Sequence, residues 1–173
     1  MIGFERVIPA CALAAGLLAS CQSQGARDRV PTTVADVQRL TDQARLARVA
    51  TTDSVWEVRT AAVWKLTDRA LLARIATTDR ASGVRRAAVA RLTDQAVLAG
   101  IATTDSETSV RLDAVAKVTD RVLLARILTT DRVGIVRQAA VGMLTDRALL
   151  ARIAATDSDE FVRAAAQRRL NRQ

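Results

Sequence analysis

The residue types best suited to chemistry in this chain are an aspartate and an arginine that recur together five times. An Asp is followed six residues later by an Arg, first at Asp53 and Arg59, and the pair returns every 26 residues. Carboxylate and guanidinium groups form charge-assisted hydrogen bonds that are often bidentate. Such a column either presents a binding ladder to a ligand or ties neighbouring turns together, and we expect the structural role. The ladder residues are Asp53, Arg59, Asp79, Arg85, Asp105, Arg111, Asp131, Arg137, Asp157 and Arg163.

Other side chains on which catalysis usually depends are scarce. The 173 residues include no His, no Tyr and two Cys, of which Cys11 lies in an apolar N-terminal run. The sequence contains no glycine-rich phosphate loop, nucleophile elbow or metal-ligand spacing. Its carboxylates form columns that run through all repeats, so no single acid–base pair stands out. We therefore expect a protein that is not an enzyme, with no cofactor, no metal site and no small-molecule substrate.

These columns belong to a unit of 26 residues that occurs five times without insertion or deletion. In the first unit, residues 40–65, Asp42 provides a helix N-cap, and Leu46, Val49 and Ala50 follow at helical spacing. A polar turn then leads to a second helix with one apolar face. Each unit predicts two helices of about ten residues, which are stable only when stacked on neighbours. A period of this size predicts an all-α solenoid.

The constant residues of the unit resemble the HEAT repeat. The pattern is an Asp in the inter-helix turn, a Val-Arg pair whose Arg lies six residues later, and then Ala and Leu. The resemblance covers residues 40–170 and implies about five and a half two-helix repeats within a domain of residues 32–173. It also implies that the Asp and Arg columns form a structural ladder. A close alternative is the leucine-rich-repeat variant, which pairs an α-helix with a 3₁₀ helix.

The N-terminal residues have the pattern of a targeting segment. Val7 to Ala19 is an apolar run that is too short to span a bilayer as a helix, and it ends at Leu18-Ala19-Ser20-Cys21. This sequence resembles the lipobox of bacterial lipoproteins. The resemblance implies a signal peptide over residues 1–20, cleavage between Ser20 and Cys21, and acylation of Cys21. An ordinary secretory signal and an uncleaved anchor are the alternatives.

Residues 21–31 predict a short flexible tether after the lipidated Cys21. The ten residues that follow Cys21 are polar and can span at most roughly 35 Å. Gln22, rather than Asp, follows the cysteine, which resembles the signal for sorting to the outer membrane. We expect a lipid-anchored protein of the bacterial cell envelope, on the outer membrane and facing the periplasm. An exported protein of this kind is not expected to bind nucleic acid.

The second helix of each unit also carries positions that differ between units. Three variable columns begin at Glu57, Thr60 and Trp64, and their spacing places them on one stripe of the helix surface. Tryptophan and arginine are enriched at interaction hot spots, so we expect a protein or peptide partner here. Neutral drift after duplication is the alternative. The candidate partner-binding residues are Trp56, Trp64, Arg86, Leu112, Ile135 and Phe161.

The chain carries a formal net charge of +8. Arg48, Arg74, Arg126 and Arg152 form a column near the ends of the first helices, which Gly100 interrupts. The arginines of this column either stabilise the helix C-termini and keep the surface soluble, or they contact anionic lipid or envelope polysaccharide. The sequence therefore predicts a membrane-anchored, non-catalytic binding scaffold. The alternatives are a basic surface for such polyanions and a spacer without a specific ligand.

Overall fold

The computed structural model describes residues 33–172, and every regular element in this part of the chain is an α-helix. The first helix of each repeat is ten residues long. These helices are α3 (Gln43–Thr52), α5 (Arg69–Thr78), α7 (Gln95–Thr104), α9 (Arg121–Thr130) and α11 (Arg147–Thr156). The predicted signal peptide, residues 1–20, and the tether with Cys21, residues 21–31, lie outside the described residues.

The second helix of each repeat is also an α-helix. These helices are α4 (Trp56–Lys65), α6 (Ser82–Arg91), α8 (Thr108–Val115), α10 (Gly134–Met143) and α12 (Glu160–Leu170). A shorter helix, α2 (Val34–Arg39), precedes the first repeat and corresponds to a second helix without its first. The structure therefore has the expected two helices per unit after a half-repeat.

The constant aspartates explain where the helices begin and end. Asp42 caps α3, and its carboxylate accepts a hydrogen bond from the Arg45 backbone N–H at 3.0 Å. Asp53 follows the last residue of α3, and its Oδ1 accepts the Val55 N–H at 2.8 Å. This second contact closes a tight turn before α4, because an Asp side chain can replace a backbone acceptor there. Both contacts recur in the later repeats.

Small aliphatic side chains fill the core between the two helices of each repeat. In the first repeat Leu46 and Ala50 of α3 and Val63 of α4 are completely buried. The corresponding positions of the later repeats join one continuous hydrophobic cluster from Val37 to Ala166. Helices of ten residues are marginal in isolation, so this packing between neighbours supplies most of their stability.

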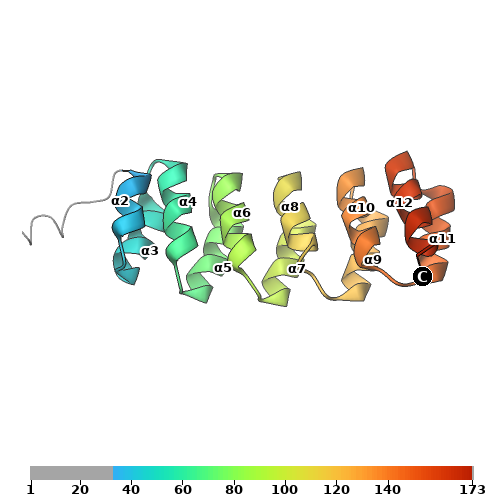
Figure 1. The fold of residues 1–173 in the computed structure, drawn as a ribbon, viewed down its shortest axis with the longest axis horizontal. Coiled ribbons are helices and arrows are strands. Elements are labelled where there is room, and N and C mark those ends of the chain that lie inside the picture. The colour runs from blue at the N-terminus through green and yellow to red at the C-terminus, as the bar shows by residue number, and fades with distance from the viewer. Residues whose placement is uncertain (1–32, 173) are drawn as a thin grey trace, which may run out of the picture. The chain divides into compact units, whose positions relative to one another are not determined.

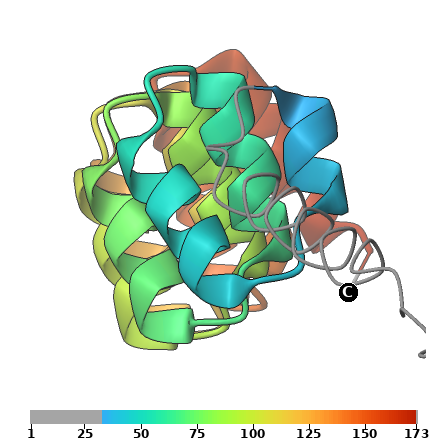
Figure 2. The same ribbon diagram turned by 90° about the vertical axis from the view of Figure 1, so that its left-hand side faces the viewer.

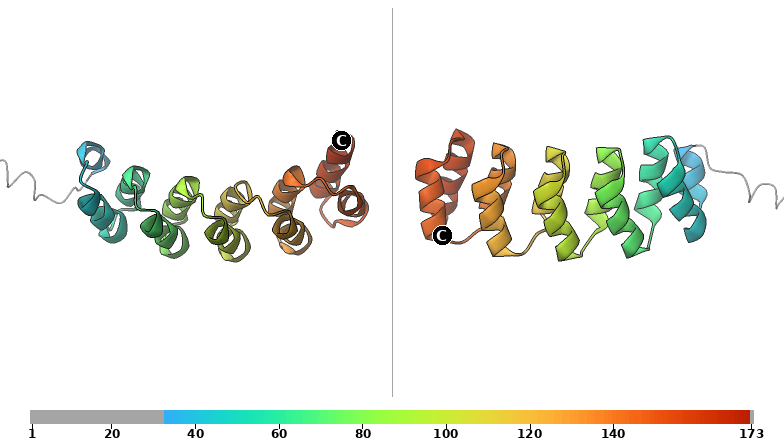
Figure 3. Two further views of the ribbon diagram at one scale, coloured as in Figure 1. Left: turned by 90° about the horizontal axis from the view of Figure 1, so that it is seen from below. Right: turned by 180° about the vertical axis from the view of Figure 1, so that it is seen from behind.

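The helices form two rows within the unit of residues 33–173, and each repeat packs on the next (Figure 1). Even-numbered neighbours such as α4 and α6 pack more extensively than odd-numbered neighbours such as α5 and α7. The even-numbered row accordingly lies on the inner side of a gentle curve (Figure 3). Seen along the row, the helix pairs of successive repeats lie one behind another (Figure 2). The packing is that of a helical repeat array.

None of the described helices is both long and apolar enough to span a membrane.

Candidate interaction surface

The arginine of each of the first four repeats binds the aspartate of the following repeat. Arg59 Nε and Nη2 donate to Oδ2 and Oδ1 of Asp79 at 2.9 and 2.8 Å, in a bidentate fork. The side chains of this pair are only 4% and 10% exposed. The same fork joins Arg85 to Asp105, Arg111 to Asp131 and Arg137 to Asp157.

The aspartate of the arginine's own repeat contributes its backbone instead of its carboxylate. Arg59 Nη1 donates to the Asp53 carbonyl at 2.9 Å, and Arg163 makes the same contact with the Asp157 carbonyl at 2.8 Å. Every ladder aspartate after Asp53 therefore closes its own turn and receives the guanidinium of the preceding repeat, whereas Asp53 only closes its turn. These contacts occupy the charged groups of the column within the protein.

Pairing in the ladder shifts the pKa values of Arg59, Asp79 and Asp157 in favour of their charged forms. The hydrogen bond from Arg137 holds the pKa of Asp157 below its ordinary value, against the opposing effect of burial. Burial raises the pKa of Asp79, but the Arg59 guanidinium and the turn backbone outweigh burial and lower this pKa below its ordinary range. The hydrogen bond to Asp79 also raises the pKa of Arg59. Each partner thus stabilises the charged form of the other.

A second ladder runs along the opposite edge of the array, where consecutive repeats are joined. We call this the junction edge, and the edge with the Asp–Arg ladder the turn edge. Lys65, at the end of α4, donates from Nζ to the Val37 and Gln38 carbonyls at 3.2 and 2.5 Å. The later donors and acceptors are Arg91 with Trp64 and Leu66, Lys117 with Val89 and Ala90, and Arg169 with Leu144.

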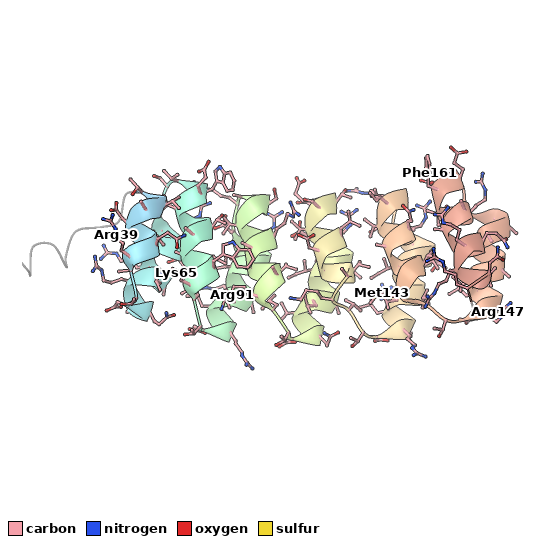
Figure 4. The ribbon with its side chains drawn as sticks, in the orientation of Figure 1. Arg39, Lys65, Arg91, Met143, Arg147 and Phe161 are labelled. Carbon is pink, nitrogen blue, oxygen red and sulfur yellow. The ribbon has the colours of Figure 1, made fainter. Side chains whose placement is uncertain are left out.

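Sequence reasoning missed this second ladder, although one signal was available. The last position of repeats one to five holds Lys65, Arg91, Lys117, Met143 and Arg169, so four of the five residues are cations. Each cation binds carbonyls at the C-terminal end of the preceding even-numbered helix, where helix carbonyls lack partners within the helix. Lys65, Arg91 and Met143 lie near the C-terminal ends of their helices, whereas Phe161 lies at the opposite end of α12 (Figure 4).

The repeats alternate in a further contact at the junction edge. Gln43 Nε2 donates to the Lys65 carbonyl at 3.2 Å, and Gln43 Oε1 accepts the Thr67 N–H at 3.0 Å. Gln95 makes the same two contacts two repeats further on, at 3.1 and 2.9 Å. The second, fourth and fifth repeats carry Arg69, Arg121 and Arg147 in this column. The first four repeats therefore form two similar pairs.

Most candidate partner-binding residues lie exposed on the even-numbered helices. Trp56, Trp64, Ile135 and Phe161 are 47%, 51%, 54% and 66% exposed, respectively. Leu112 differs from them because it is partly buried and packs against the core. The exposed candidates belong to columns that vary between repeats, and none of their side chains takes part in either ladder, although the Trp64 carbonyl accepts a hydrogen bond from Arg91.

Arg86 forms an ion pair within the protein. Its Nε donates to Asp113 Oδ2 at 2.7 Å, and the two side chains are 50% and 35% exposed. Asp113 replaces an alanine found at this position in the other repeats. Since an exposed ion pair contributes only about 0–1 kcal/mol, a partner could still displace it.

Trp56 reaches from the first repeat onto the second. A Cβ added at Gly83 would lie 2.9 Å from the Trp56 ring, so the indole rests directly on this glycine. The contact fixes one face of the ring and leaves almost half of the side chain in solvent. Such a ring is a pre-ordered apolar platform on the even-numbered row.

In residues 33–172, no group of three or more His, Cys, Asp or Glu side chains has a metal-binding arrangement. Comparisons with known protein families, with curated proteins and with solved structures find no match.

Proposed function

We propose that this chain is a non-catalytic binding scaffold that holds a protein or peptide on its even-numbered helices. One observation carries the proposal: the cations of both ladders bond groups within the chain, while large apolar side chains stand exposed in the variable columns. Trp64, Ile135 and Phe161 are at least half exposed on α4, α10 and α12. Aromatic and large apolar side chains of this kind serve as anchors at protein interfaces.

A HEAT-like α-solenoid of about five and a half repeats is the finer fold that we propose. The Asp–Arg forks between successive repeats and the extensive packing of the even-numbered row support it. The second helix of every repeat is an α-helix, which favours this proposal over the leucine-rich-repeat variant with its 3₁₀ helices.

We further propose that the scaffold is attached to a bacterial membrane through Cys21, on the periplasmic side of the outer membrane. The lipobox-like sequence that ends at Cys21 supports this proposal. Acylation would supply more than one chain, as stable attachment requires. Cys21→Ala should abolish labelling by a radiolabelled fatty acid and release the protein from membranes, and labelling that persists would reject this site of attachment.

Cross-linking in intact cell envelopes, followed by affinity purification, tests the binding face. A defined partner should be recovered with the wild-type chain and lost with Trp64→Ala or Ile135→Ser. Val122→Ser is the matched control, because Val122 is an apolar side chain on α9 with 80% exposure. Recovery of the same partner from all variants would reject the even-numbered face. Loss of the partner with the Val122 variant alone would place the contact on the odd-numbered row.

A further inference from the structure

Two hollows of matching composition lie on the turn edge. The first, of 470 Å³, is lined by the ends of α3 and α5 and includes Arg74 and Arg80. The second, of 370 Å³, is lined by the ends of α7 and α9 and includes Arg126 and Arg132. The four arginines are exposed, and each pair occupies the same repeat positions as the other. Threonine side chains and the buried Arg59 or Arg111 complete the two linings.

The Asp–Arg ladder removes most negative charge from these hollows. Asp79 in the first hollow is bound by Arg59, and Asp131 in the second is bound by Arg111. The exposed arginines at the rims are therefore not needed to neutralise the ladder. The threonine hydroxyls donate to helix carbonyls, as Thr78 does to Arg74 at 2.8 Å. The guanidinium groups of the exposed arginines are consequently the cationic donors that face an anion, although Arg80 also donates from Nη2 to the Ser54 carbonyl at 2.9 Å.

The two hollows differ in the charge of their surroundings. Asp105, which lines the second hollow, is bound by Arg85 at 2.8 Å. The equivalent residue of the first hollow is Asp53. Among the described residues no arginine side chain donates to its carboxylate. The second hollow therefore has the more positive surroundings.

The junctions on either side of the second hollow provide internal comparisons. Between the second and third repeats, Gly100 and Ser106 stand where the hollows have arginines. Between the fourth and fifth repeats, Leu128 stands at the position of Ala50 and Ala102. Ser158 stands at the position of Arg80 and Arg132. Only two of the four junctions thus carry both arginines, and these two are separated by one junction that carries neither.

We propose that the two hollows bind an acidic polysaccharide that lies along the turn edge. Guanidinium forks match carboxylate and phosphate groups in bidentate geometry. Helices pack about 8–10 Å apart, so equivalent points two repeats apart lie roughly 20 Å from each other, a span that one linear polymer can bridge. Recessed sites in a single line favour a flexible chain over the flat surface of a lipid bilayer. This inference does not depend on the partner proposed for the even-numbered row.

Binding of fluorescently labelled polygalacturonate to the full-length chain, measured by anisotropy in a non-ionic detergent, tests the proposal. Arg126→Gln with Arg132→Gln should weaken binding about tenfold, because hydrogen bonds to charged groups are lost from one site. Arg74→Gln with Arg80→Gln should weaken it less, since the first hollow is the less positive. Loss of both hollows should cost about a hundredfold, because the polymer loses its two-site attachment.

The control variant Arg69→Gln with Arg121→Gln removes the same charge from the starts of two odd-numbered helices, away from the hollows. It should weaken binding less than about threefold, as expected for screened charges at a distance. Equal losses in the hollow and control variants would overturn the proposal, because net charge alone would then explain binding. Failure of the wild-type chain to bind, with binding instead to vesicles that contain phosphatidylglycerol, would also overturn it.

The proposal can also be tested by adding arginines and measuring a gain of binding. Gly100→Arg with Ser106→Arg should create a third hollow between the other two and strengthen binding at least about threefold. A Cβ at Gly100 would meet no atom within 4 Å, so the helix accepts the substitution. Gly100→Ala with Ser106→Ala should leave binding unchanged. A gain with the alanine pair equal to that with the arginine pair would contradict a role for the guanidinium groups.

Discussion

The turn edge and the junction edge of the array are both held by charged side chains, but they differ in how strictly they specify the residue. At the turn edge the residue is Arg in every repeat, and in the first four repeats its acceptor is a carboxylate that is 10% exposed or less. At the junction edge the donor is Lys in two repeats and Arg in two, Met143 takes the position in the fourth repeat and offers no donor, and the acceptors are backbone carbonyls.

The difference in residue choice follows from the acceptor group that loses its partner when the donor is absent. A buried carboxylate without its cation is costly, whereas carbonyls at a helix end can bond water. The junction donors also gain less from their contacts. Burial lowers the pKa of Lys117, which means that its ammonium group is less stable there than in water. Similarly, the Arg91 Nε is buried without a hydrogen-bond partner.

The largest effect should come from breaking the turn-edge ladder in the middle. Arg111→Ala leaves Asp131 buried without its cation, and we expect a loss of about 3–5 kcal/mol in the free energy of unfolding. Arg163→Ala is the control, since Arg163 bonds only backbone carbonyls of its own turn, and should cost about 1 kcal/mol. Denaturant unfolding of both variants measures the difference. Similar losses would mean that the forks between repeats add little.

Acid should weaken the turn edge before the junction edge. Asp79, Asp105 and Asp157 have lowered pKa values in the folded protein. Their contribution to stability is therefore complete above the unfolded value of about 3.9 and is lost as the pH falls through the folded values. Unfolding free energy measured between pH 7 and pH 2 should fall below about pH 4. Asp105→Asn should have a shallower fall, and an unchanged slope would contradict the assignment.

A smaller loss should follow from interruption of the junction ladder. Lys117→Met copies at α6 the arrangement that Met143 creates at α8, and it should cost about 0.5–1.5 kcal/mol. The effect should be local, with faster amide hydrogen exchange over the last turn of α6. Exchange that accelerates equally throughout the array would show that the contact has a global role.

The reverse change should give the smallest effect, a gain. Met143 is 42% exposed and lies at the position where a cation would face the end of α8. Met143→Lys should stabilise the array by about 0.5–1 kcal/mol through the helix-end carbonyls. It should also slow exchange at the end of α8, which is two residues shorter than α4, α6 and α10. Unchanged exchange at that helix end would show that a cation at position 143 does not bind the α8 carbonyls.

Much of this architecture could be predicted from the sequence, because the period repeats the same local signals five times. The Asp caps, the helix lengths and the half-repeat at Val34–Arg39 follow from residue type and spacing. The acceptor of each ladder arginine did not follow. Asp53 and Asp79 stand in the same column, and only the stacking of repeats decides that Arg59 binds the carboxylate of the second.

The candidate surface was harder to predict than the fold. Exposure separates Phe161 and Ile135 from the partly buried Leu112, although all three occupy variable columns. Arg86 was selected by type, yet it is bound to Asp113 on the next even-numbered helix, α8. Both outcomes depend on the orientation of neighbouring helices, which a repeat alignment does not contain.

The most direct test of the account places a photo-reactive amino acid at Phe161 in one chain and at Val122 in another, each within intact envelopes. Both side chains are exposed, at 66% and 80%, but Phe161 lies on the even-numbered row and Val122 on the odd-numbered row. If the even-numbered row holds the partner, position 161 gives one defined protein adduct and position 122 gives none. The same adducts from both positions, or a defined adduct from position 122 alone, would contradict that placement.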